Sequence, residues 1–271
     1  MMKFKPAKIP KNDAKRVEAV VRTGVLDTNE SHLYEIYCFL AREITGCPTS
    51  WTGVMDTDRQ FALARSGFPD GLPMEVPRNQ TLCQFAVEVA KPLIIPDMSK
   101  DERFQYHPVV TERGVKFYAA FPIITTDGYM LGTLCVSDIK VRRLSNHKIN
   151  LLTNLADKLA YQLEVQVSQR KNTAETSIKI MSKLMSRISD ITLQNAITIL
   201  KFFIDDVTTI EEKNKMIELG LAIKIKDRIM VSKFGKEFQQ ELELNIGTLK
   251  RMKNLSDDEN ELMKMLNQLE V

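Results

Sequence analysis

A polar segment at residues 96–116 holds the side chains best suited to binding a charged ligand. It contains Asp97, Arg103 and His107. The guanidinium of an arginine offers a planar pair of donors to a carboxylate or phosphate. Asp97 and Arg103 could therefore place an acid and a base at the mouth of a pocket, or they could only fasten the loop. Because long polar loops in compact domains are often functional, we expect this segment to border a site.

The other side chains with distinctive chemistry are four cysteines, three histidines and one tryptophan. The cysteines show no CxxC pair, and each lies in or beside an apolar stretch: Cys38, Cys47, Cys83 and Cys135. The histidines lack the spacing of metal ligands, so we expect no metal site. Reduced, mostly buried thiols are expected. Trp51 could stack on a ligand or belong to the core.

Length and charge limit the class of protein. The chain has 271 residues, 27% of them charged, and a formal net charge of +3. This balance gives no overall bias toward nucleic acid or anionic lipid, and the length suits two modest domains. The basic start lacks the apolar run of a secretory signal, and no window approaches the ~18 apolar residues of a membrane span. We expect a cytoplasmic protein without a membrane partner.

Residues 117–138 predict a β-hairpin with two apolar faces. Phe117, Ala119 and Phe121 alternate with other apolar residues, and Thr126–Gly128 supplies turn chemistry. Such a hairpin needs helices over one face and another cover, which can be a ligand, over the second. Strands are also expected at residues 50–55, 60–65 and 93–95, and helices at residues 33–44 and near 82–89. The fold class is therefore α+β, an antiparallel sheet flanked by helices.

A long helix is expected after the hairpin. Apolar residues keep helical spacing from Ile149 to Ile188, and neither Gly nor Pro occurs between Gly132 and Gly220. One interpretation is a signalling helix or short coiled coil that pairs with a second copy of the chain, giving a homodimer. The other is two separate helices joined near Lys171.

The order of these elements resembles that of GAF domains, the small-molecule sensor modules of signalling proteins. Six segments carry the resemblance: RTGVLDT (22–28), MDTDRQ (55–60), LCQFAV (82–87), PDMSKDERFQYHPVV (96–110), FYAAFPI (117–123) and GTLCVSD (132–138). Together they extend over about residues 14–168. The resemblance implies a GAF-type sheet and a sensor function, without fixing the ligand.

The family's pocket lies between the sheet and the loop that follows the second helix. Carried over by position, the resemblance implies these ligand-binding residues: Trp51, Phe61, Cys83, Asp97, Arg103, Phe104, His107, Phe117, Ala119 and Cys135. A shift of one residue in the inferred strand register would turn every side chain of that strand to the opposite face of the sheet, and so would change which of its residues face the pocket.

The family also includes an enzyme that reduces free methionine sulfoxide with pocket cysteines. By that resemblance Cys83 and Cys135 could be a redox pair, although buried thiols that act as small hydrophobes are favoured. The signature of cyclic-nucleotide-binding relatives is absent, and no thiol matches the bilin attachment position. We expect no cofactor, no catalytic residues and no enzymatic activity.

Residues 191–271 resemble, more loosely, a winged-helix module. Helices are expected at residues 193–203, 210–219 and 234–244, a hairpin that turns at Asp227, and a last amphipathic segment at 256–269. Binding of DNA by such a module would use five basic residues: Lys213, Lys215, Lys224, Lys226 and Arg228. The near-neutral charge of the module and the acidic Glu211 and Glu212 favour docking of a protein instead.

These observations predict four parts and one function. The parts are a flexible start (1–13), a GAF sensor domain (14–168), a helical connector (169–190) and a winged-helix-like domain (191–271). The function is a signalling protein whose GAF domain binds a small molecule or partner and relays this through the connector to the output domain. A DNA-binding regulator and a methionine sulfoxide reductase are the alternatives.

Overall fold

The computed structural model describes residues 4–28, 31–69, 71–187, 193–203, 209–226 and 228–242. The chain divides into two compact units, Met1–Val167 and Ser168–Val271. Whether these units are independent domains with the predicted limits stays a prediction.

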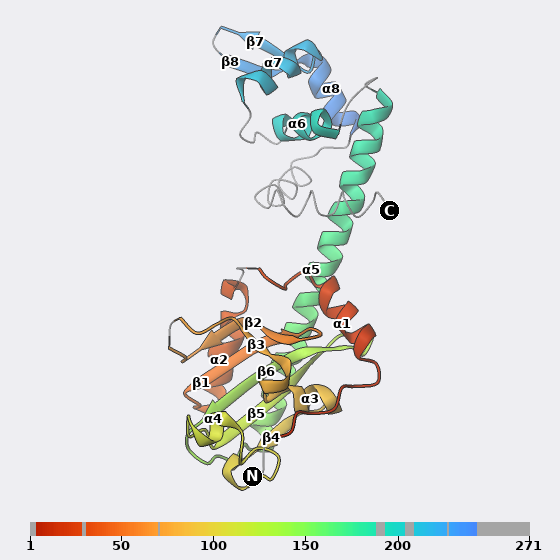
Figure 1. Ribbon diagram of the computed structural model, residues 1–271. Coiled ribbons are helices and arrows are strands. Elements are labelled where there is room, and N and C mark those ends of the chain that lie inside the picture. Colours follow the sequence, from red (N-terminus) through yellow and green to blue (C-terminus); the bar gives the residue numbers. More distant parts are fainter. Residues whose placement is uncertain are drawn as a thin grey trace. The chain divides into compact units, whose positions relative to one another are not determined.

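The first unit is built on one antiparallel sheet in the order β3-β2-β1-β6-β5-β4 (Figure 1). The strands are β1 (Thr49–Met55), β2 (Arg59–Ser66), β3 (Glu75–Pro77), β4 (Leu93–Ile95), β5 (Phe117–Ile124) and β6 (Met130–Asp138). The helices are α1 (Asp13–Arg22), α2 (Glu35–Thr45), α3 (Cys83–Val89), α4 (Pro108–Thr111) and α5 (Asn146–Arg187), with short 3-10 turns at Ser31–Leu33, Arg78–Gln80 and Met98–Lys100. The predicted α+β fold is confirmed.

The predicted hairpin is formed by β5 and β6, which pair from Phe117 with Asp138 to Ile124 with Met130. The turn between them closes with a hydrogen bond from the Gly128 N–H to the Thr125 carbonyl at 2.9 Å, and Gly128 has a φ of +84°. Glycine adopts this left-handed conformation without a steric penalty, which explains why the turn falls there.

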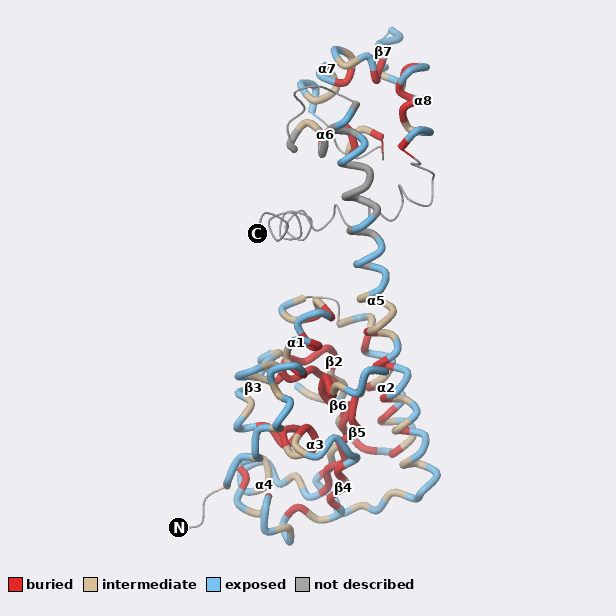
Figure 2. The backbone as a smooth tube through the Cα atoms, turned by 90° about the vertical axis from the view of Figure 1, so that its right-hand side faces the viewer, coloured by how far each residue is buried: buried red, intermediate tan, exposed pale blue. Residues whose placement is uncertain are grey.

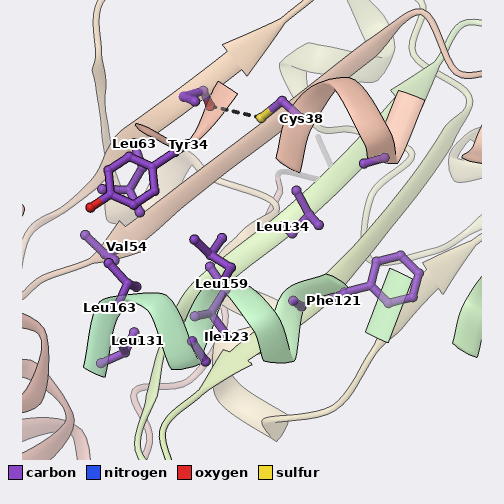
Figure 3. Packing of buried hydrophobic residues seen from close by; sticks show 14 of the residues in the cluster. Tyr34, Cys38, Val54, Leu63, Phe121, Ile123, Leu131, Leu134, Leu159 and Leu163 are labelled. Atoms are coloured by element: carbon purple, nitrogen blue, oxygen red, sulfur yellow. Dashed lines mark hydrogen bonds between the residues drawn. The ribbon is translucent and has the colours of Figure 1, made fainter. Parts of the chain in front are cut away.

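One face of the sheet packs against α2 and α5. Figure 3 shows Val54, Leu63, Phe121, Ile123, Leu131 and Leu134 of the strands meeting Tyr34, Cys38, Leu159 and Leu163. The thiol of Cys38 donates to the carbonyl of Ala64 at 3.4 Å. In Figure 2 the buried segments are concentrated in the strands and on the inward sides of these helices. This face is the main core of the unit.

The opposite face of the sheet is covered by α3 and residues 96–116. Its cluster includes Met55, Tyr118 and Cys135 from strands, Cys83 and Ala86 from α3, and Met98 and Phe104 from the polar segment. Two apolar faces therefore have two different covers, as the alternation in the hairpin predicts.

The long helix α5 runs from Asn146 to Arg187 as one element of 42 residues. The structure thus follows the continuous helix rather than two helices joined near Lys171. Its first turns carry the residues that pack on the sheet: Leu152, Ala156, Leu159, Ala160 and Leu163. The pairing of α5 with a second copy stays a prediction.

The second unit contains α6 (Leu193–Phe203), α7 (Ile210–Glu218), β7 (Ala222–Ile225), β8 (Arg228–Val231) and α8 (Lys233–Glu241). Its core includes Ile199, Phe203, Met216, Leu221 and Phe238. The expected helices and hairpin are present, but resemblance to a winged helix is not confirmed. The expected turn residue 227 and amphipathic segment 256–269 lie outside the described residues.

Candidate functional site

A cavity of about 720 Å³ lies on the sheet face opposite the α2 and α5 core. Most of its lining is apolar, with a few polar groups, which is the usual composition of small-molecule sites. The side chains that the argument uses are Phe4, Trp51, Gln60, Cys83, His107, Tyr118 and Cys135. They come from the N-terminal segment, five secondary-structure elements (β1, β2, α3, β5 and β6) and the polar loop.

Four of the ten predicted ligand residues line this cavity: Trp51 of β1, Cys83 of α3, His107 before α4, and Cys135 of β6. Trp51 and Cys135 are paired in neighbouring strands and so lie side by side on the same sheet face. The ring of Trp51 meets Phe68 edge-on at 5.9 Å between centroids. That these residues bind a ligand stays a prediction.

Phe61, Phe117 and Ala119 do not line the cavity, and their predicted placement is corrected. All three are buried in the core shared with α2 and α5. Successive side chains of a strand point to opposite faces, so their neighbours Gln60 and Tyr118 face the cavity instead. In β5 both faces are apolar, and the alternation of apolar residues alone therefore did not distinguish them.

Asp97 and Arg103 also lie outside the cavity lining and do not pair with each other. The carboxylate of Asp97 accepts the Ser99 N–H at 3.2 Å and its hydroxyl at 2.5 Å, and these bonds lower the pKa of Asp97. Arg103 pairs with Asp101 at 2.7 Å. Each charged residue thus fixes its own local turn, and the loop is not fastened by an Asp97–Arg103 pair.

Phe104 is buried beneath the loop rather than exposed in the cavity. Its side chain is 0% exposed, and its ring lies 4.8 Å from that of Phe85. The guanidinium of Arg103 lies over the Phe104 ring itself, 4.8 Å from its centroid. Phe104 therefore anchors the polar segment to α3 through a T-shaped aromatic contact.

The polar floor of the cavity is a cluster around the sulfur of Cys83. Gln60 Nε2 donates to Cys83 Sγ at 3.1 Å, and Tyr118 Oη lies 3.0 Å from the same sulfur. A hydrogen bond from Cys135 is the largest of several that lower the pKa of Cys83, against burial, which raises it. The same bond raises the pKa of Cys135. The cluster therefore favours a thiolate on Cys83 and a thiol on Cys135.

His107 is held in one tautomer by the backbone around it. Its Nδ1 accepts the Val109 N–H at 3.1 Å, so the proton belongs on Nε2, which lies 3.0 Å from the Gln80 carbonyl. Burial lowers the pKa of His107. The side chain caps α4, ties it to residue 80 and forms part of the cavity lining.

The N-terminal segment supplies a wall of the cavity that sequence reasoning missed. The ring of Phe4 meets that of His107 edge-on at 4.4 Å and that of Phe85 at 5.9 Å. The Ala7 N–H donates to Gln84 Oε1 at 2.9 Å. Residues 1–13 were expected to be a flexible start, but the part beginning at Phe4 packs on the first unit. A lone aromatic in a basic stretch was the one available signal.

The five basic residues predicted to bind DNA lie on α7 and the β7–β8 hairpin. Lys215 pairs with Glu218 at 3.1 Å, and Lys224, Lys226 and Arg228 are exposed on the hairpin. Lys213 is half-buried. Glu212 accepts the Thr209 N–H in a capping box that begins α7. Binding of DNA by this unit stays a prediction.

Within the described ranges, no group of three or more metal-binding side chains gathers. Across the same ranges, every helix is too short or too polar to cross a membrane. The expectations of no metal and of a cytoplasmic protein stay predictions.

The sequence model of the GAF domain family matches residues 30–163. A cyclic di-GMP phosphodiesterase of Pseudomonas aeruginosa is 27% identical over 149 residues, which are 54% of this chain and 25% of that protein. The chain thus matches only a quarter of the length of that relative.

Solved structures with a similar fold have low sequence identity. The GAF domain region of a membrane protein from Geobacter sulfurreducens has a TM-score of 0.44 at 18% identity, covering 55% of this chain and 99% of that one. A type II free methionine-R-sulfoxide reductase from Thermoplasma acidophilum has a TM-score of 0.42 at 15% identity, covering 49% and 92%.

The prediction of no enzymatic activity is corrected by the curated relative, because that relative is an enzyme. The shared region is the GAF region, so the match supports the family and assigns no activity to this chain. The matched family model and the six-stranded sheet with its flanking helices agree on one conclusion. Residues 30–163 of this chain are a GAF domain.

Proposed function

We propose that the chain is a signalling protein whose GAF domain binds a small molecule in the cavity over the sheet. The observation that carries this proposal is the cavity itself, about 720 Å³ with a mostly apolar lining. This volume lies within the ~300–1,000 Å³ range of small-molecule sites. Trp51 adds a large aromatic side chain to this lining, on which a ligand ring could stack.

The relay would pass through the sheet to α5. Tyr118 and Cys135 line the cavity, while their strand neighbours Phe117 and Leu134 pack in the core that includes the first turns of α5. A ligand that moves one set of side chains therefore acts on the backbone that carries the other set. Because protein interiors are close-packed, a displacement of one side chain is passed on to the side chains that contact it.

A second contact connects the hairpin turn to α5. Glu164 Oε1 accepts the Thr126 N–H at 2.8 Å and its hydroxyl at 2.7 Å. Since α5 continues to Arg187, we propose that it carries the signal toward the second unit, which docks a protein or a second copy. DNA is the less favoured partner because Glu211 and Glu212 head α7.

The binding step is tested by a thermal-shift screen of the full chain against a metabolite collection. A ligand at 100 times its dissociation constant should add ~2.7 kcal/mol to the stability of the unit that binds it. Trp51→Ala should weaken the shift, because it removes an indole from the lining. Phe39→Ala is the matched control, since Phe39 is 52% exposed on α2.

The relay is tested with any ligand found in that screen. We expect it to change hydrogen exchange in residues 146–187 as well as around the cavity. Exchange that changes only near the cavity would reduce the proposal to a binding module without a relay. If a ligand raises the melting temperature of Trp51→Ala as much as that of the unaltered chain, the ligand binds outside the cavity.

A further inference from the structure

Two of the four thiols lie together in the cavity and two do not. Cys83 and Cys135 both line the cavity and are 5% and 7% exposed. Cys38 and Cys47 are buried in the main core on the other side of the sheet. A small molecule that enters the cavity can therefore meet the first pair without any opening of the core.

The surroundings of Cys83 favour its reactive form. The sulfur is contacted by the amide of Gln60 at 3.1 Å and the hydroxyl of Tyr118 at 3.0 Å, and Cys135 belongs to the same buried cluster. Several donors aimed at one sulfur stabilise a thiolate, and the thiolate is the nucleophile in thiol chemistry. In contrast, burial raises the pKa of Cys38 to about 12 and also raises that of Cys47.

The donors also indicate which reagents suit this sulfur. Gln60, Tyr118 and Cys135 are neutral, so the cluster offers no counter-ion to a charged reagent. The cavity walls are mostly apolar, with Trp51 and Phe4 among them. A small uncharged oxidant matches both properties, and a hydroperoxide is the simplest reagent of that class.

We propose that Cys83 and Cys135 form a peroxide-responsive pair, which an uncharged hydroperoxide entering the cavity oxidises to a disulfide. This inference rests on the cavity of the proposed sensor function but does not require a reversible ligand. The disulfide joins the start of α3 to the middle of β6. It also turns the sulfur that Gln60 and Tyr118 contact into an uncharged disulfide sulfur.

The reaction takes two balanced steps. The Cys83 thiolate attacks one peroxide oxygen, an S–O bond forms as the O–O bond breaks, and the released oxygen leaves protonated as water or an alcohol. The sulfur of Cys135 then attacks the sulfenic sulfur of Cys83. The S–S bond forms, the S–O bond breaks, and hydroxide leaves with the Cys135 proton as water. The two thiols together lose two electrons, which the hydroperoxide gains.

The test treats the full chain with hydrogen peroxide, blocks remaining thiols by alkylation, and maps the digest by mass spectrometry. We expect a cross-linked peptide containing Cys83 and Cys135, formed at least about tenfold faster than any oxidation of Cys38 or Cys47. Oxidation of the folded chain at Cys38 or Cys47 at the same rate, or no cross-link at all, would overturn the proposal.

Three variants separate the two steps. Cys135→Ser should trap a sulfenic acid on Cys83 that dimedone labels, and Cys83→Ser should abolish both the label and the cross-link. Cys47→Ser, a buried thiol outside the cavity, should leave the cross-link rate unchanged. If a variant folds poorly, the peptide map of the unaltered chain still shows whether the Cys83–Cys135 cross-link forms.

The result is independent of the ligand screen. A cross-link without any stabilising metabolite would support the thiol pair and weaken the reversible sensor. A stabilising metabolite with inert Cys83 and Cys135 would support the sensor and remove the thiol pair.

Discussion

Arg16 is a buried charge that joins α1 to the two central strands of the cavity-bearing sheet, and its removal should destabilise the GAF domain. Its side chain is only 1% exposed. The Nε group donates to Asp13 Oδ1 at 2.7 Å and Nη1 to the Met55 carbonyl at 2.5 Å. Longer bonds reach the carbonyls of Met130 at 3.4 Å and Asp56 at 3.3 Å. One guanidinium thus ties α1 to β1, to β6 and to the turn after β1.

Arg16→Met keeps an apolar stem of similar length but deletes every one of these donors. Breaking a buried ion pair costs ~3–5 kcal/mol when the remaining charge is stranded. Asp13 is not stranded, since Arg78 also donates to both of its oxygens at 2.7 and 2.8 Å. The main loss is then the buried Met55 carbonyl, at ~1–3 kcal/mol, plus the charged hydrogen bond itself. We expect a total of about 3 kcal/mol, the low end of the buried-pair range.

The assay is urea unfolding followed by the fluorescence of Trp51, the single tryptophan of the chain. Because Trp51 belongs to the first unit, this signal reports the GAF domain. Arg22→Met is the matched control on the same helix, since Arg22 is 60% exposed and meets Asp127 at 3.4 Å. An exposed pair of this kind contributes below ~1 kcal/mol. Equal losses in the two variants would refute the energetic reasoning.

Three further predictions test other parts of the molecule. Burial raises the pKa of Asp13, but hydrogen bonds from Arg78 and Arg16 outweigh it and lower the pKa overall. The ionised Asp13 therefore stabilises the fold above the unfolded pKa of ~3.9, and this stabilisation is lost as pH falls through the lower folded pKa. Asp13→Asn should lower the urea midpoint at pH 6, and the midpoint of this variant should fall less steeply toward pH 3 than that of the parent. Phe4→Ala removes a cavity wall and should speed alkylation of Cys83 by iodoacetamide several-fold, with Phe39→Ala as the control; an unchanged rate would mean that Phe4 does not limit access. Gly235→Ala places a Cβ 2.2 Å from the Leu221 carbonyl oxygen and should cost the second unit ~1–3 kcal/mol, seen as faster hydrogen exchange in α8 with the Trp51 transition unaltered.

The fold was predictable because its strands and helices follow simple apolar periods. The hairpin of β5 and β6 was predictable from alternation and from the turn residues before Gly128. The face that each strand turns to the cavity was not, because Phe117 and Tyr118 are both large and largely apolar. The polar atoms of Tyr118 and Gln60 are the signal that could have decided it, since polar groups are rarer in a core than in a ligand site.

Contacts between distant parts of the chain lay beyond the sequence pattern. In α1 the structure buries the charged Arg16 and leaves the apolar Val21 59% exposed, the reverse of what residue type alone indicates. The carbonyls that bind Arg16 lie 39 and more residues away, and carbonyls carry no sequence signal. Phe4 was missed for a similar reason, because its partner His107 is contributed by a distant loop.

The two inputs proposed for the cavity differ in how strongly they can act on α5. A reversible ligand shifts a conformational equilibrium only by its difference in affinity for the two states. A bond between Cys83 and Cys135 instead fixes α3 against β6 covalently. The backbone of β6 also carries Leu134 and Val136, which pack in the core shared with α5. A disulfide at this position would therefore act on the strand whose other face packs in the core with α5. Oxidation should then alter hydrogen exchange in α5 at least as much as any bound metabolite does.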